Sequence, residues 1–265
     1  MHLDILDQYR GGASPVHRLD PRVKLVCTVA FILVAALMPD GAWGGLAALA
    51  ALWLAAALFS EVPLALLLRR GLVALPFALA ALTVLFTVPG EPLVALSLGR
   101  LQIAVTDAGA VRFATILLKS WLSVLMAVLL AATTTFPDIV RAMHSLRVPG
   151  VLVAIIAFAF RYLFVLGDEA LRLLRAREAR MAAAPAGGRS GGSIAWRAQV
   201  VGQMAGSLFV RSIARSERVY HAMASRGYRG ELRWLDPPRA QRWDWAVAGA
   251  FLGLLLLIGI VARVV

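Results

Sequence analysis

Arginine is the residue type in this chain with the clearest capacity for chemistry, and that chemistry is the binding of carboxylates and phosphates. The 265 residues include 27 lysines and arginines against 15 acidic residues, a net charge of +12, and Lys24 and Lys119 are the two lysines. Guanidinium groups keep their charge when partly buried and offer a planar fork to anionic oxygens. We therefore expect an acidic protein surface or anionic lipid as partner, and nucleic acid is the least favoured.

The arginines concentrate in two stretches that close in similar ways. The first contains Arg172, Arg175, Arg177 and Arg180 and ends in Ala179-Arg180-Met181. The second contains Arg211, Arg215 and Arg218 and ends in Ala222-Met223-Ala224-Ser225-Arg226-Gly227-Tyr228. The glycine-rich segment 185–193, read as a flexible linker, separates the two stretches.

The second stretch has the periodicity of an amphipathic helix. Phe209, Ile213, Tyr220 and Met223 form an apolar stripe apart from the arginines. Arg226 falls at the expected helix end, where a cation suits the dipole and Gly227 suits the cap. A solvated basic helix explains these features, and so does a helix end presented to an acidic groove on a partner. The duplication of the ending favours the second interpretation.

Signals of catalysis, of metal binding and of a bound cofactor are missing from the sequence. No GxxxxGK[ST] segment occurs, so no ATP-binding P-loop is predicted. The four histidines form no HxH or HxxxH pair, and Cys27 is the single cysteine. We expect no catalytic residue, no metal site and no cofactor in this chain.

Hydropathy assigns the chain to the membrane class. It is 60% hydrophobic and 16% charged, with a mean hydropathy of +0.78, whereas soluble domains carry about 25% charged residues. The predicted spans are 23–38, 43–59, 71–88, 113–135 and 243–261. The expected fold is an all-α membrane protein with about five transmembrane helices and a cytoplasmic coupling domain of long amphipathic helices.

Arginine placement predicts how these spans are oriented. Basic loops favour the cytoplasmic side, so the N-terminus and the arginine-rich block 141–242 are placed there. The apolar segment 151–166 would carry that block outward if it crossed, so we expect it to lie at the membrane surface. The predicted domains are 1–135 with four spans, 136–242 as the coupling domain, and 243–265 as the last span.

Three motifs resemble one known family. Residues 17–25 read His-Arg-Leu-Asp-Pro-Arg-Val-Lys-Leu, 175–181 read Arg-Ala-Arg-Glu-Ala-Arg-Met, and 222–228 close the second stretch. Together they resemble the T component, the CbiQ/EcfT family, of energy-coupling factor (ECF) ABC transporters, and the resemblance runs from end to end. Met181 and Ser225 depart from the usual glycine and alanine of the two coupling motifs.

The resemblance implies specific roles for these residues. Arg180 and Arg226 would couple to ATPases, with Ala179, Ser225 and Gly227 beside them. The family's N-terminal motif corresponds to Leu19, Asp20, Pro21, Arg22 and Lys24.

The resemblance also implies partners and a cargo. Two cytoplasmic ATPase subunits would bind the ATP, and a CbiM-like membrane subunit would bind the substrate. This chain would then be a non-catalytic subunit of the cytoplasmic membrane. The context of residues 14–20 resembles the cobalt branch, and nickel relatives look much alike. The alternatives are a membrane scaffold whose basic helices bind anionic lipid, and a transporter that acts alone.

Overall fold

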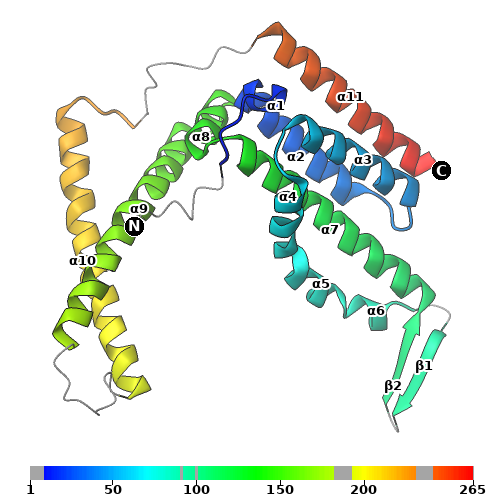
Figure 1. The fold of residues 1–265 in the computed structure, drawn as a ribbon, viewed down its shortest axis with the longest axis horizontal. Coiled ribbons are helices and arrows are strands. Elements are labelled where there is room, and N and C mark those ends of the chain that lie inside the picture. The colour runs from blue at the N-terminus through cyan, green and yellow to red at the C-terminus, as the bar shows by residue number, and fades with distance from the viewer. Residues whose placement is uncertain (1–8, 90–91, 99–100, 182–192, 231–240, 265) are drawn as a thin grey trace. The chain divides into compact units, whose positions relative to one another are not determined.

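The computed structural model describes residues 9–89, 92–98, 101–181, 193–230 and 241–264. The chain divides into two compact units. We call Asp7–Ser145 with Asp236–Val265 the core unit, and Leu146–Leu235 the long-helix unit. Each unit is described by itself below, and Figure 1 gives the order of the elements.

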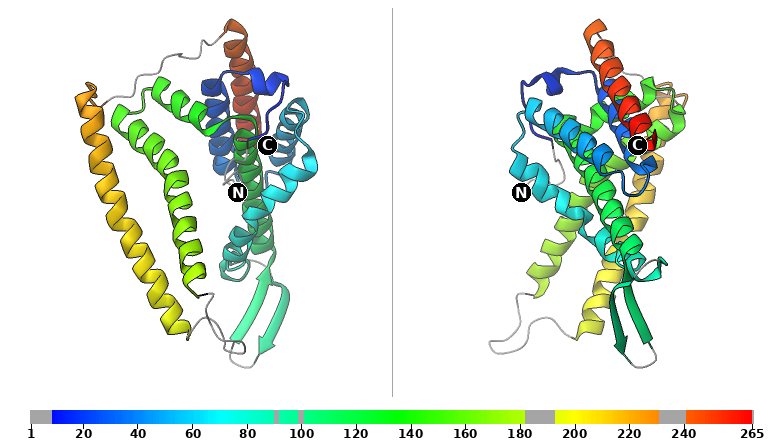
Figure 2. Two further views of the ribbon diagram at one scale, coloured as in Figure 1. Left: turned by 60° about the vertical axis from the view of Figure 1, so that its left-hand side comes forward. Right: turned by 90° about the vertical axis from the view of Figure 1, so that its right-hand side faces the viewer.

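Four long helices build the core unit. They are α2 (Pro21–Leu37), α3 (Trp43–Phe59), α7 (Asp107–Thr133) and α11 (Arg242–Val264). The short helices α1 (Pro15–Arg18) and α8 (Phe136–Ser145) lie at one end of the bundle, and α8, although predicted within the coupling domain 136–242, packs against α2. Figure 2 shows α2, α3, α7 and α11 gathered into one bundle.

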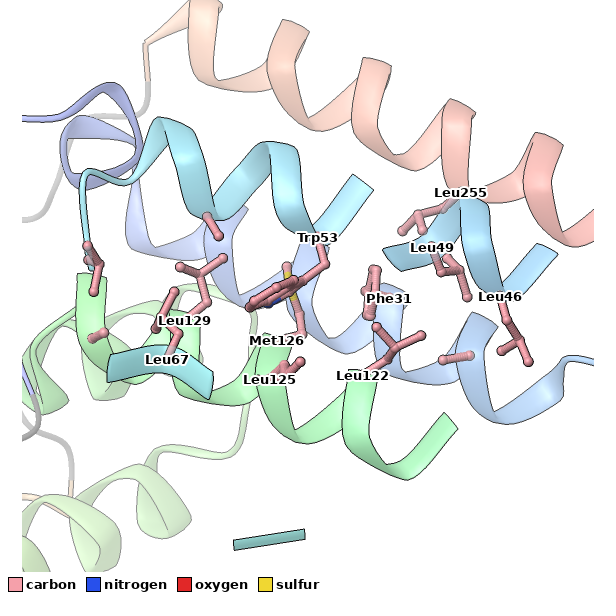
Figure 3. Packing of buried hydrophobic residues seen from close by; sticks show 14 of the residues in the cluster. Phe31, Leu46, Leu49, Trp53, Leu67, Leu122, Leu125, Met126, Leu129 and Leu255 are labelled. Carbon is pink, nitrogen blue, oxygen red and sulfur yellow. The ribbon is translucent and has the colours of Figure 1, made fainter. Parts of the chain in front are cut away.

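The interior of this bundle is apolar and interlocked. Phe31 of α2, Leu49 of α3 and Leu125 of α7 are almost fully buried in one cluster with Leu255 of α11 (Figure 3). By contrast, many large apolar side chains on the outer faces are exposed, among them Leu58 and Leu256. A helix bundle whose outer surface is as apolar as its interior is stable in a lipid bilayer but not in water. The all-α membrane fold is therefore confirmed.

The third predicted span, 71–88, differs from a single straight helix. The chain there forms α4 (Leu64–Gly71), a 3₁₀ turn (Leu72–Ala74), α5 (Leu75–Ala81) and α6 (Val84–Thr87). The segment bends by 44° between Leu64–Ala74 and Leu79–Thr87. Pro76 supplies a reason, because its ring removes one helical hydrogen bond and clashes with the preceding turn.

A short antiparallel hairpin follows α6. Strand β1 (Pro92–Leu98) pairs with β2 (Leu101–Thr106), with Leu98 opposite Leu101 next to the turn. The sequence analysis assigned no strand here, so the hairpin is an addition to the otherwise helical fold. Helix α7 begins directly after it, with Thr106 as N-cap accepting from the Gly109 amide.

Within the described ranges, three helices are long and apolar enough to cross a membrane, namely α7, α9 (Gly150–Met181) and α11. The bent pair would make a fourth span, and α3 is a shorter apolar helix. Helix α9 joins the apolar segment 151–166 and the charged segment after it into one continuous helix. Placement of 151–166 at the membrane surface stays a prediction.

A charge cluster closes the loop between α2 and α3. Lys119 of α7 donates to the carbonyl of Met38 at 2.6 Å and lies 3.2 Å from Asp40. Arg112 also reaches the Asp40 carboxylate, at 3.3 Å. The ammonium thus satisfies a carbonyl at the end of α2, and Asp40 balances the charges of Lys119 and Arg112.

Helices α3 and α11 approach closely at Gly45. A Cβ atom there would lie 2.8 Å from Cβ of Ala262, whereas Gly44 has nothing within 4 Å. We therefore expect Gly45→Ala to force the two helices apart and to cost about 1–3 kcal/mol, in the range of overpacked cores. Thermal unfolding in detergent measures this cost.

Gly44→Ala is the matched control for Gly45→Ala. It adds the same methyl group one residue earlier, facing open space. We expect it to leave stability unchanged or raise it, since alanine is the better helix former. Equal unfolding temperatures for the two variants would contradict the close approach.

Candidate functional site

The long-helix unit consists of two helices of equal length. Helices α9 (Gly150–Met181) and α10 (Ile194–Ser225) each have 32 residues, which corresponds to about 48 Å at 1.5 Å per residue. Figure 1 shows them running in opposite directions. Their C-terminal ends, which carry the two predicted coupling arginines, therefore point away from each other.

The end of α10 is a defined structure. Gly227 has a φ of +84°, and its amide donates to the Ala224 carbonyl while the Tyr228 amide donates to the Met223 carbonyl, both at 3.0 Å. This pair of hydrogen bonds is the Schellman motif, which needs a left-handed residue at the position of Gly227. The predicted helix stop at Gly227 is confirmed.

The Schellman motif holds Arg226 at the tip of α10. Arg226 is the C-cap residue and is exposed. Ser225 before it is turned back on the helix, since its hydroxyl donates to the His221 carbonyl at 2.7 Å. A hydroxyl bonded to its own helix leaves the guanidinium as the group presented outward.

Arg180 occupies the corresponding place on α9. It lies in the last helical turn and is exposed, as is Ala179 before it. Among the residues that the structure describes, the guanidinium groups of Arg180 and Arg226 have no hydrogen-bond or ion-pair partner. The predicted linker 185–193 lies outside the described residues, apart from Ser193, the N-cap of α10.

Glu169 joins the two long helices. Its carboxylate is 2.9 Å from the guanidinium of Arg172, one turn later on α9, and 2.9 Å from that of Arg211 on α10. The Glu169 side chain is 20% exposed and that of Arg211 60% exposed. The sequence analysis singled out the arginines and missed this carboxylate. Its position three residues before Arg172 was the available signal.

We expect the Glu169–Arg211 contact to show as a coupling energy in a double-mutant cycle. Glu169→Gln and Arg211→Gln should each loosen the helix pair, and the double variant should cost less than the sum of both. The expected coupling is about 0.2–1 kcal/mol, because the pair is partly exposed. Thermal unfolding of the four proteins in detergent measures it, and strict additivity would contradict the contact.

The N-terminal motif lies in the core unit and starts α2. Asp20 is its N-cap and accepts from the Arg22 amide at 2.8 Å, and Pro21 is the first helical residue. Both are favoured at helix starts. Leu19, with extended backbone, separates α1 from this cap. The sequence of the motif is therefore explained first by helix geometry.

Lys24 connects the motif to another helix, α7. One turn into α2, it is buried, and its ammonium donates to the Thr133 carbonyl at 2.9 Å. Thr133 is the last residue of α7, where carbonyls lack helical partners and the dipole favours a cation. The amide of Arg10 donates to the neighbouring Ala132 carbonyl at 3.0 Å.

A small hydrogen-bonded turn precedes the motif. Ser14 caps α1 and is 2.6 Å from Nδ1 of His17, whose Nε2 is 2.9 Å from the Arg10 carbonyl. Serine and histidine here hold the N-terminal segment in place. Neither was predicted as a site residue, and the Ser-Pro helix start was the available signal.

The motif opens onto a polar cavity of about 270 Å³. Its lining brings together the end of α7, the start of α8 and the start of α11, represented by Thr134, Asp138 and Asp244. Asp20 and Lys24 complete it. Among the described residues no group of three or more histidine, cysteine or acidic side chains is placed to hold a metal ion.

We expect Lys24→Met to destabilise the core unit. Methionine keeps the apolar stem but leaves the buried Thr133 carbonyl without its donor, a loss of about 1–3 kcal/mol. Arg69→Met, which removes an exposed cation from the end of α4, should change stability by less than 0.5 kcal/mol, as surface substitutions usually do. Thermal unfolding of both variants in detergent is the measurement, and equal shifts would contradict the buried bond.

Comparison with known proteins agrees with this arrangement. Residues 12–234 match the family described as CbiQ, Cobalt transport protein. That range includes the N-terminal motif and both long helices.

Individual relatives cover most of the chain. The Energy-coupling factor transporter transmembrane protein EcfT of Listeria innocua is 30% identical over 97% of this chain and 96% of its own. The protein of the same name from Lacticaseibacillus paracasei is 31% identical over 96% of this chain and 98% of its own. The Cobalt transport protein CbiQ of Rhodobacter capsulatus is 26% identical over 60% of this chain and 62% of its own.

The matches extend over both units, from the capped start of α2 to the Schellman end of α10. The chain belongs to the CbiQ/EcfT family, the multi-pass T components of energy-coupling factor transporters in the cytoplasmic membrane.

Proposed function

We propose that this chain couples ATP hydrolysis by two cytoplasmic ATPase subunits to the uptake of a transition-metal ion. The observation that carries the proposal is the pair of exposed, unpartnered arginines at the opposite-pointing ends of α9 and α10. Each arginine stands at the C-terminus of a long helix, and each is free to enter an acidic groove. Two such ends provide one contact for each ATPase.

The coupling step follows from how a helix transmits motion. A guanidinium bound to a carboxylate in a desolvated groove is a strong, directional contact. When ATP draws the two ATPases together, the helix ends that they hold move with them. The motion reaches the rest of the long-helix unit because α9 and α10 are continuous helices. The chain then switches between two conformations, and it links the nucleotide bound to the ATPases to the orientation of the substrate site in the partner subunit.

The ATP and the substrate are proposed to bind outside this chain. ATP binds to the ATPase subunits, and the metal ion to a CbiM-like membrane subunit. Cobalt is the proposed cargo, because the matching family model bears the description Cobalt transport protein. Nickel is the alternative, and uptake assays with each ion in the assembled transporter distinguish them.

We expect Arg180→Glu and Arg226→Glu each to strip an ATPase from the purified complex. Reversing the charge places a carboxylate against an acidic groove and should weaken binding at least about thirtyfold, as losses of 2–5 kcal/mol at buried charge pairs imply. Co-purification of the tagged chain with its ATPases measures the loss, and coupled ATP hydrolysis should fall with it.

The matched controls are charge reversals on the same helices. Arg175→Glu tests α9, and Arg218→Glu, two turns before Arg226, tests α10; both arginines are exposed. Arg172 is unsuitable as a control, because it already pairs with Glu169.

The control variants distinguish specific binding of the ATPases at the two helix ends from unspecific attraction between the basic helices and any anionic surface. Retention of both ATPases by the controls supports a coupling role confined to the helix ends. If all four variants behave alike, the arginines act as a general charge patch toward anionic lipid, and the scaffold interpretation replaces this one.

A further inference from the structure

A deep apolar cleft opens at one end of the core unit. Helices α3 and α11 approach closely at Gly45 and Ala262, and the cleft lies at the other ends of the same two helices. Its lining includes Ala56 and Phe59 from the last turns of α3, and Val247 and Phe251 from the first half of α11. The floor is formed by α2 and α7, and the volume is about 440 Å³.

The apolar cleft borders two polar cavities. It shares Leu19 and Lys24 with the 270 Å³ cavity described above. A third cavity, of about 480 Å³, shares Leu19 and Trp243 with the cleft. Leu19 lines all three, so the apolar cleft and the two polar cavities adjoin at this residue. We call the two polar cavities together the polar mouth.

Two of the charged residues that line the polar mouth have opposite signs and are not paired with each other. Arg18 and Asp244 both line each of the two polar cavities. In the part of the chain that the structure describes, Arg18 has no ion-pair partner, and Asp244 accepts the backbone amide of Gln241 at 2.8 Å. Asp244 is 7% exposed. A carboxylate this buried is costly unless a cation or further donors reach it.

Trp243 indicates the depth of this mouth in the membrane. Its side chain is 72% exposed at the start of α11, directly before the apolar run of that helix. Exposed tryptophans at the ends of membrane helices lie at headgroup level. The charged mouth therefore faces lipid headgroups, and the cleft extends from it toward the acyl chains.

We propose that this site binds one phospholipid whose headgroup carries a phosphate and a primary ammonium, as phosphatidylethanolamine does. The phosphate lies at Arg18, the ammonium donates to Asp244, and an acyl chain fills the cleft. The cleft volume falls within the range of about 300–1,000 Å³ typical of small-molecule sites.

The experiment is native mass spectrometry of the full, delipidated chain in detergent. Phosphatidylethanolamine, phosphatidylcholine and phosphatidylglycerol with identical acyl chains are added separately. One copy of phosphatidylethanolamine should be retained at least about tenfold more tightly, the effect of one charge-assisted hydrogen bond. The choline headgroup has no N–H to donate, and the glycerol headgroup has no cation.

Two kinds of variant locate the bound lipid. Asp244→Asn should remove the preference for phosphatidylethanolamine, and Arg18→Gln should weaken retention of all three lipids, which share the phosphate. Arg69→Gln, an exposed arginine outside the cleft, should change neither. Ala56→Phe should fill the cleft and block binding, and Ala51→Phe, on the exposed face of α3, should leave it intact. Thermal unfolding confirms that each variant is folded.

Several results would overturn the proposal. Equal retention of the three lipids means an unspecific lipid layer, and tightest binding of phosphatidylglycerol means an anion site. Unchanged binding in Ala56→Phe means that the lipid lies elsewhere. Co-purification of the Ala56→Phe chain with membrane proteins tests the other occupant, because loss of a membrane partner without loss of lipid means that the cleft is a protein-docking surface. None of these measurements needs ATPases, so the result is independent of the proposed coupling function.

Discussion

Two buried or half-buried ammonium groups hold the core unit together at its two ends. Lys24 of α2 donates to the carbonyl of Thr133, the last residue of α7, and Lys119 of α7 donates to the carbonyl of Met38, the C-cap of α2. Each lysine thus donates to a carbonyl at the C-terminus of the other's helix. Carbonyls there lack helical partners, and the negative end of the helix dipole favours a cation. These are the two lysines of the whole chain. A lysine suits this role, since its flexible stem can pass along apolar surface to a single acceptor.

This reciprocal closure explains why the N-terminal motif reads as it does. Asp20 and Pro21 start α2, and one helical turn later Lys24 faces α7. Because α8 begins two residues after Thr134 and packs on α2, fixing the end of α7 also fixes the start of the path toward the long helices. A motif that looks like a basic membrane anchor is, in the structure, a set of helix caps.

Local signals in the sequence were sufficient where a residue acts on its own helix. The cap at Gly227, the amphipathic α10 and the bounds of α3 followed from periodicity and from residues at helix ends. The cap at Asp20 was not predicted, although aspartate before proline is a helix-start signal. The sequence could not show contacts between distant positions. Lys119 meets Met38 across 81 positions, and Glu169 meets Arg211 across 42. Pro76 lies inside the third predicted span, but whether a proline bends a membrane helix depends on neighbours that satisfy the freed carbonyl.

The clamp at Glu169 also divides each long helix into two mechanical segments. From Glu169 to Arg180 there are 11 residues and from Arg211 to Arg226 there are 15, so the free segments are about 16 Å and about 22 Å long. If the clamp acts as a fulcrum, a rotation of about 10° displaces the shorter tip by about 3 Å and the longer by about 4 Å, on the same rise per residue. The two tips then have unequal strokes, and two ATPases that close symmetrically would pull on the helix pair asymmetrically.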